Sequence, residues 1–233
     1  MDAISSILRF QDVTIESGPL YETGLWNIGF ELQPGDLLLL RLESEQERLP
    51  LADAAEGLAP AVEGSAAFLG EDWQAMSADH AAEQRGKIGR VFDDGGWIRN
   101  LEVDQNIMLA QRHHTPRPEE EIRREALKLA GLFGLPGLPT GRPSTVRRLD
   151  LRKAACIRAF LGQPVLIILE EPTRDMYADL IAPLVNAVQS ARKRGAAVLW
   201  TTTDGATWNN AGLRPTVHAK MFGSQMHMIR QEP

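Results

Sequence analysis

The sequence predicts an α/β fold with a largely parallel central sheet. Short apolar runs, typical of buried strands, alternate along the chain with longer segments of helical periodicity, and this order favours strands joined by helices. Two of the runs, Leu37–Leu40 and Ala197–Thr203, are typical of strands buried on both faces. With 233 residues, 43% of them hydrophobic, the chain can bury a sizeable core as one large domain or a domain with a subdomain.

The first part of the chain predicts antiparallel strands followed by a strand-loop-helix unit. Segments 7–15 and 24–32 are rich in β-branched and aromatic residues and alternate loosely, which predicts two antiparallel strands. The Pro34-Gly35 turn then leads into the buried strand, a polar loop and an Ala- and Leu-rich helix over 51–58. Further strands are predicted at 64–70 and 87–92.

The second part predicts helices, two strands and a closing hairpin. Residues 119–133 form an amphipathic helix, and a Gly- and Pro-containing loop follows it. A strand is predicted at 165–170, and a helix at 179–193 with Pro183 inside about its first turn. Residues 217–222 and 225–229, joined through Gly223-Ser224, predict a β-hairpin.

Composition excludes several classes of function. The net charge of −6 and a pI near 5.4 provide no basic surface for nucleic acid or for anionic lipid. The single Cys156 rules out an intramolecular disulfide framework and favours a reducing compartment, so we expect the cytosol. No apolar run approaches the roughly 20 residues of a membrane span, and the amino terminus has no basic region followed by an apolar one, so we expect no direct membrane insertion.

Residues 34–58 carry a family resemblance. Their order of turn, strand, loop and helix resembles, without a gap, the phosphate-loop region of ABC transporter nucleotide-binding domains. The resemblance extends from about Ile7 to Ile229 and rests on five motif positions. It implies an ABC-type P-loop NTPase fold, with an antiparallel β subdomain and a small inserted helical subdomain. The implied boundaries are 1–95 and 151–233 for the core with the β subdomain, and 96–150 for the helical subdomain.

The phosphate loop differs from the family pattern at every functional position. Such a loop needs glycines to turn backbone N–H groups toward phosphates, a lysine, and hydroxyls that ligate magnesium. Here the glycine positions carry Leu42, Glu45 and Glu47, the lysine position carries Arg48, and the hydroxyl positions carry Leu49 and Pro50. Glu43 adds a third carboxylate, and like charges about 4 Å apart repel by roughly 4 kcal/mol at an effective dielectric near 20. We expect no triphosphate site in this chain.

The other motif positions implied by the resemblance are also changed. The glutamine that ligates magnesium is replaced by Asp93, and the signature that opens a helix reads Val146–Asp150. Glu170 stands where the family has an aspartate, Glu171 stands at the catalytic glutamate, and Thr203 at the terminal histidine. Because a general base without bound nucleotide has nothing to act on, no catalytic residue and no metal ligand is expected.

Some residues permit two interpretations. Tyr21 is the nearest aromatic residue to the family's adenine-stacking position, although an ordinary surface or core tyrosine is favoured. Asp93 could bind a metal but is expected to be a solvated loop acid, and Arg147 with Arg148 could meet an anion or only face solvent. His113 and His114 have no spaced partners and are expected to face solvent.

The loop after segment 87–92 is where the resembled family receives its membrane subunit. Phe92, Trp97, Ile98 and Leu101 form an apolar group beside Gly95 and Gly96. The group could be part of the core, or it could be a docking surface with Trp97 as its anchor.

The sequence therefore predicts a non-catalytic ABC subunit that docks on an integral membrane permease and pairs with an intact ABC ATPase homologue. ATP and magnesium would be bound only in the partner, and the subunit would lie on the cytoplasmic, inner face of the cell membrane. Residues 95–98 and His114-Thr115 resemble ATPases of MCE-type lipid transport systems, which suggests lipid transport in a bacterial envelope. Two alternatives remain: an ATPase with an unorthodox site using Arg48, Glu170 and Glu171, and a free-standing soluble regulator.

Overall fold

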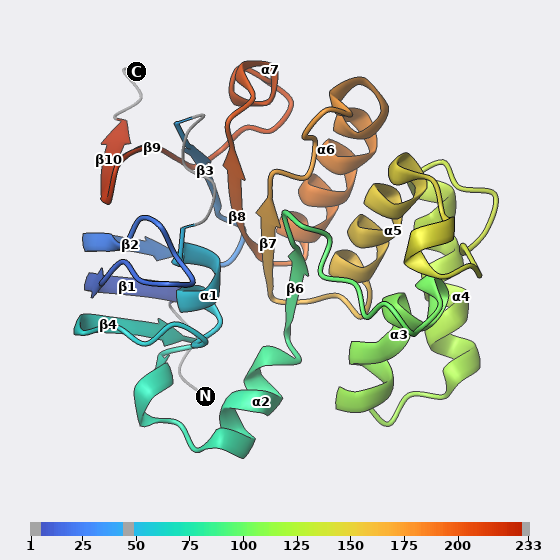
Figure 1. Cartoon of the computed structure of the whole chain (residues 1–233), viewed down its shortest axis with the longest axis horizontal. Coiled ribbons are helices and arrows are strands. Elements are labelled where there is room, and N and C mark those ends of the chain that lie inside the picture. Colours follow the sequence, from blue (N-terminus) through green and yellow to red (C-terminus); the bar gives the residue numbers. More distant parts are fainter. Residues whose placement is uncertain (1–5, 44–48, 230–233) are drawn as a thin grey trace.

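A six-stranded sheet forms the centre of the computed structural model, which describes residues 6–43 and 49–229 (Figure 1). Its strand order is β10-β9-β3-β8-β7-β6, and all neighbours are parallel except β9 and β10. The strands are β3 (Leu37–Arg41), β6 (Ile88–Val91), β7 (Leu166–Glu170), β8 (Ala197–Thr202), β9 (Val217–Phe222) and β10 (Gln225–Ile229). The predicted α/β class, the largely parallel sheet and the closing hairpin are confirmed.

A second, antiparallel sheet lies beside the first (Figure 1). Its strand order is β2-β1-β4-β5, with β1 (Leu8–Ile15), β2 (Leu25–Leu32), β4 (Glu63–Phe68) and β5 (Glu71–Asp72). The predicted antiparallel pairing of β1 with β2 is confirmed. The Trp26 N–H donates to the Ser224 carbonyl at 2.8 Å and so connects β2 to the turn between β9 and β10.

Helices cover the central sheet and extend from one of its ends (Figure 1). The α-helices are α1 (Leu51–Ala55), α2 (Ala78–Arg85), α3 (Val103–His114), α4 (Glu119–Leu132), α5 (Arg148–Phe160), α6 (Tyr177–Lys193) and α7 (Gly205–Trp208), with 3₁₀ turns η1 (Trp73–Ala75) and η2 (Pro143–Thr145). Helix α4 lies farthest from the antiparallel sheet. Within the described residues, no helix is both long enough and apolar enough to cross a membrane.

Strand β3 separates two hydrophobic cores. Leu37 and Leu39 belong to the core beneath α3 to α6, whereas Leu38 and Leu40 belong to the core shared with α1 and the antiparallel sheet. Since successive side chains of a strand point to opposite faces, a strand between two cores needs apolar residues throughout. This explains the uninterrupted leucines that the sequence shows.

Several helical details differ from the sequence prediction, among them α1, which ends at Ala55 and not at residue 58, and α3, which was not predicted as a helix. Helix α2 was not predicted, because only Ala81 and Gln84 of its eight residues are buried and no apolar stripe marks it. Its start is capped by Ser77, which accepts from the His80 N–H. Helix α6 begins at Tyr177, before the predicted start, so Pro183 lies beyond the first turn instead of within it.

Gly89 lets β6 approach α5 closely. A Cβ atom at this position would lie 1.8 Å from the Ala159 carbonyl oxygen. The central sheet and α5 can therefore meet at this distance only where the strand has no side chain.

Gly89→Ala is expected to lower the free energy of unfolding by about 1–3 kcal/mol, because the added methyl group must displace backbone. The matched control is Gly131→Ala on α4, where a Cβ would meet no heavy atom within 4 Å. That change should raise stability by roughly 0.5–1 kcal/mol through helix propensity. Urea unfolding measures both, and equal midpoints for the two variants would contradict the close approach.

Candidate functional site

A cavity of about 570 Å³ opens at the carboxyl ends of β3, β6 and β7. In open α/β sheets this edge is where ligands bind. Leu42 and Leu49, at the first glycine position and the first hydroxyl position of the phosphate loop, line the cavity. The predictions for Glu45, Glu47 and Arg48 lie outside the described residues. The acids and the arginines that line it are Glu22, Asp53, Asp93, Asp94, Glu170, Glu171, Arg90 and Arg174.

Arg90 on β6 holds three carboxylates beside this cavity. Its Nη1 donates to Asp53 Oδ1 at 2.6 Å and to Glu56 Oε2 at 2.5 Å. Its Nε donates to Glu170 Oε2 at 2.7 Å. Asp53 lies on α1, Glu56 is the C-cap residue of α1 and Glu170 ends β7, so one guanidinium on β6 joins three elements. We call these four residues the Arg90 cluster.

Burial governs the electrostatics of the Arg90 cluster. Only 8% of the Arg90 side chain is exposed, and its three partners are between 11% and 18% exposed. Burial opposes the charge on Arg90, but Glu56, Glu170 and Asp53 outweigh it and raise the pKa of Arg90. Burial also raises the pKa values of Glu56 and Glu170, although Arg90 works in the opposite direction on both. The guanidinium therefore stays charged and is the cation of the cluster.

Tyr21 is attached to the same cluster. Its hydroxyl donates to Asp53 Oδ2 at 2.5 Å, and its ring packs against the core that includes α1. The hydroxyl thus orients Asp53 toward Arg90, a role that the two interpretations from the sequence did not include.

Glu171, at the catalytic glutamate position, is turned toward the end of β8. Its backbone has φ +43°, and only 3% of its side chain is exposed. Its Oε1 accepts a hydrogen bond from the Thr203 N–H, while Oε2 is buried with no hydrogen-bond partner among the described residues. Burial raises the pKa of Glu171, opposed by Thr203 and Arg174. The two residues at the catalytic glutamate and terminal histidine positions therefore contact each other.

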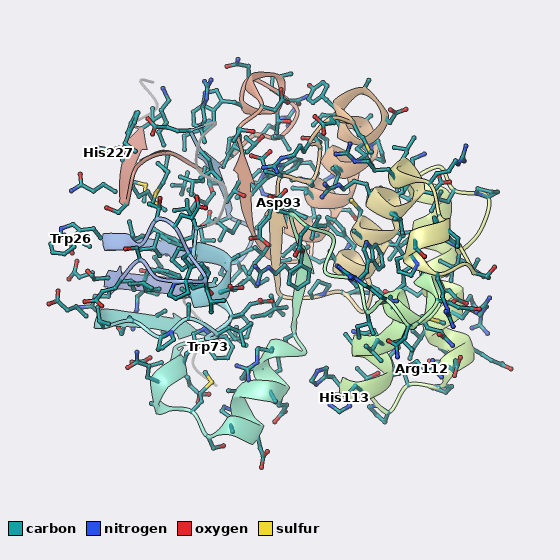
Figure 2. The ribbon with its side chains drawn as sticks, viewed as in Figure 1. Trp26, Trp73, Asp93, Arg112, His113 and His227 are labelled. Carbon is teal, nitrogen blue, oxygen red and sulfur yellow. The ribbon has the colours of Figure 1, made fainter. Side chains whose placement is uncertain are left out.

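Asp93 is held by arginines. Arg174 Nη1 donates to Asp93 Oδ2 at 3.0 Å, and Arg152 donates to the carbonyls of Phe92 and Asp93. Figure 2 shows Asp93 near the middle of the molecule. Among residues 6–43 and 49–229, no group of three His, Cys, Asp or Glu side chains is arranged to hold a metal ion.

The signature position forms ion pairs within the chain. Arg147 is the N-cap of α5 and its Nε donates to Asp150 Oδ2 at 2.8 Å. Arg148 Nη2 donates to Asp175 Oδ2 at 2.8 Å, although both side chains are more than half exposed. From the sequence, these arginines were expected either to face solvent or to bind an anion. In the structure each forms an ion pair with an aspartate of the same chain.

Arg158 holds the loop predicted to dock a membrane subunit. Its two terminal nitrogens donate to the carbonyls of Gly95 and Gly96, each at 2.8 Å. Its guanidinium stacks over the Trp97 ring at 4.7 Å and over the Phe92 ring at 5.2 Å. Burial lowers the pKa of Arg158 to about 10, which still leaves it charged at neutral pH.

The same loop exposes an isoleucine. Trp97 is partly buried against the larger core, whereas Ile98 is 43% exposed. Asn106 accepts from the Ile98 N–H and donates to the carbonyls of Ile98 and Leu101. Trp97 therefore supports the loop, and Ile98 presents the apolar surface.

The two adjacent histidines lie away from the cavity. His113 and His114 are at the end of α3, and Figure 2 shows His113 and Arg112 far from Asp93. Burial lowers the pKa of His114, and His113 adds to the effect.

The sequence interpretation missed Asp53, Glu56 and Arg90. The available signal was an arginine within the apolar segment KIGRVF, together with two acids one turn apart on the Ala-rich helix after the loop. That these side chains meet depends on how α1 packs over the sheet, which periodicity does not reveal.

Replacing Arg90 by Met is expected to destabilise the fold by about 3–5 kcal/mol at pH 7.5, because three partly buried carboxylates lose their cation. Burial already raises the folded-state pKa values of Glu56 and Glu170, and without Arg90 these values rise further above the unfolded ones. Part of the missing stability therefore returns as the pH falls toward 5. Urea unfolding at both pH values measures this, with Arg124→Met on the exposed face of α4 as control. An unchanged midpoint at pH 7.5 would show that the cluster is unimportant.

No family model matches the chain. Several curated proteins, however, are similar to it in sequence. The chain is 27% identical over 169 residues to the intermembrane phospholipid transport system ATP-binding protein MlaF of Haemophilus influenzae, covering 72% of this chain and 62% of that protein. It is 31% identical over 151 residues to the sulfate/thiosulfate import ATP-binding protein CysA of Brucella melitensis, covering 64% and 41%. The chain thus spans less than two thirds of the length of both relatives.

Solved structures show the same fold. A dimeric bacterial ABC transporter cassette superposes with a TM-score of 0.81 at 16% identity, over 97% of this chain and 100% of the other. The structure of an ATP-binding subunit of an ABC transporter superposes with a TM-score of 0.78 at 18% identity, over 96% and 90%. The relatives and the shared fold bear out the resemblance read from the sequence: the chain has the fold of ABC transporter cassettes and is similar in sequence to ATP-binding proteins of transport systems.

Proposed function

We propose that this chain is a non-catalytic subunit of an ABC transporter, which docks on a membrane permease and pairs with an ATP-hydrolysing homologue. The observation that carries the proposal is the Arg90 cluster. Glu170 stands where the family's aspartate orients magnesium, and here its carboxylate is bound by Arg90. A metal would have to compete with a guanidinium that already has three carboxylate partners.

The state of Glu171 supports the same proposal. A general base must reach the water that it activates. Glu171 instead accepts from the Thr203 N–H and is almost wholly buried. The alternative of an unorthodox ATPase using Glu170 and Glu171 would require both carboxylates to leave these partners.

Docking on a permease is supported by the loop that follows β6. Arg158 fixes the carbonyls of Gly95 and Gly96, so the loop is ordered before any partner arrives. Preorganisation lowers the entropic cost of binding. Ile98 provides an exposed apolar contact on this loop, with Trp97 stacked behind it.

Pairing with an intact homologue follows from the motif positions. In the resembled family each nucleotide lies between the phosphate loop of one subunit and the signature of the other. A homodimer of this chain would alter both sites, whereas a heteromer would keep the partner's phosphate loop. We propose a heteromer with at most one nucleotide, bound by the partner, and peripheral attachment on the inner face of the cell membrane.

Lipid transport is the proposed process. Its support is the resemblance of residues 95–98 and His114-Thr115 to MCE-type ATPases, together with the similarity to MlaF, whose name assigns it to phospholipid transport. The similarity to CysA, named for sulfate and thiosulfate import, shows that sequence relatives differ in cargo.

The purified chain is expected not to bind ATP with magnesium, because the loop glycines and hydroxyls are replaced and Arg90 holds Glu170. Isothermal titration calorimetry measures this, with an intact ABC ATPase in the same buffer as positive control. A dissociation constant below about 100 μM, near −5.5 kcal/mol, would contradict the proposal.

Ile98→Asp is expected to reduce recovery of the permease at least tenfold, since it places a charge in the apolar contact. The experiment is co-purification in detergent with a permease subunit from the same organism, co-expressed with this chain. Leu127→Asp on α4 is the matched control, because Leu127 is 44% exposed and lies outside the loop. Trp97→Ala should also reduce recovery, through the loop that it supports.

Circular dichroism establishes that each variant is folded. Undiminished recovery of the permease with a folded Ile98→Asp would refute docking through this loop. Equal loss with Leu127→Asp would show that the effect is not specific to it. Recovery of this chain paired only with itself would refute the heteromer.

A further inference from the structure

Two basic side chains lie next to each other at the carboxyl edge of the central sheet. Arg41 ends β3 and Lys220 lies on β9, and the two are register partners in the parallel pairing of these strands. Leu39 and Arg41 share one face of β3, while Ala219 and Met221, on either side of Lys220, belong to the core on the opposite face. Both basic side chains therefore point to the same face, from strands about 4.8 Å apart.

This arrangement is electrostatically unfavourable without an anion. Like charges directly opposite each other on neighbouring strands destabilise a sheet. Other partly buried arginines are neutralised or bonded: Arg90 by carboxylates, and Arg158 and Arg192 by backbone carbonyls. For Arg41 and Lys220, no ion pair or side-chain hydrogen bond is present among the described residues.

The pair lines a cavity of its own. This second cavity, of about 590 Å³, is lined by Arg41, Leu42, Glu43, Thr203, Lys220, Met221 and Phe222. Of the residues that the structure describes, it shares Leu42 alone with the cavity beside Arg90. Among the described residues that line this cavity, the two cations are accompanied by one carboxylate, that of Glu43. Glu43 is exposed to solvent, so screening weakens its repulsion of a bound anion. Phe222, 49% exposed, adds an apolar surface.

We infer that this cavity binds a phosphate group between Arg41 and Lys220. A phosphate supplies the negative counter-charge that neither cation has nearby, and its oxygens can accept hydrogen bonds from both side chains. The arginine fork can bind two of these oxygens, while the lysine acts as a point charge. The ligand is a phosphorylated compound with an apolar part that lies on Phe222, either a soluble metabolite or a phospholipid headgroup. The inference does not depend on the proposed docking role.

The first experiment is calorimetric titration with inorganic pyrophosphate, without metal and at low salt. The expected dissociation constant is in the low millimolar range, which stays compatible with the absence of a tight ATP site. Arg41→Gln and Lys220→Gln should each weaken binding at least tenfold. Arg124→Gln, an exposed arginine on α4, is the matched control and should leave binding unchanged.

The second experiment identifies the source of the phosphate. Flotation with vesicles containing phosphatidic acid, compared with phosphatidylcholine alone, tests the lipid headgroup. Flotation that is lost in both variants assigns the site to a lipid, and pyrophosphate binding without flotation assigns it to a soluble compound.

The control for correct folding of each variant is its melting temperature, measured without ligand. Each variant removes the repulsion between two like charges, so it should melt at or above the temperature of the unsubstituted chain. Folded variants that bind pyrophosphate and vesicles as the unsubstituted chain does would overturn the inference. Absence of binding to both probes in the unsubstituted chain would overturn it as well.

Discussion

The Arg90 ion cluster is the interaction on which the rest of the candidate site depends. One guanidinium connects the helix after the phosphate-loop position, the edge strand β6 and the end of β7, and Tyr21 extends the connection to the region before β2. Three carboxylates so close together in a partly buried place would otherwise repel each other. Their convergence is tolerated because the compensating cation belongs to the chain itself, so the geometry needs no bound ion or nucleotide.

Much of the fold could be predicted from the sequence, because the signals were local. The leucines of β3 predicted a strand buried on both faces, and Gly223-Ser224 predicted the hairpin of β9 and β10. Helix α2 escaped prediction since it buries little, and the start of α6 was misplaced because Met176 provides no side-chain cap. Periodicity reveals elements that bury a continuous apolar face. Helix α2 has no such face, and periodicity does not mark the first residue of α6.

The candidate site was predicted only in part. Motif spacing singled out Asp93, Glu170, Glu171 and Thr203, and in the structure these residues lie at the carboxyl edge of the sheet, where the ends of parallel strands meet. Which side chains these residues contact depends on the tertiary packing of segments that are far apart in the sequence. Asp53 and Glu56 look like ordinary helix-surface acids, and nothing in their neighbourhood in the sequence indicates that Arg90 lies opposite them.

Helix α5 has, near each of its ends, an arginine that contacts another segment of the chain. Arg148, in its first turn, reaches Asp175 in the segment before α6, and Arg158, in its last turn, grips the backbone of Gly95 and Gly96. A helix of 13 residues is a stiff rod about 20 Å long. The signature position, which we propose faces a paired subunit, and the loop with Ile98 are thus both held by one helix. A displacement at either end of this helix would be transmitted to the other end without a chemical step.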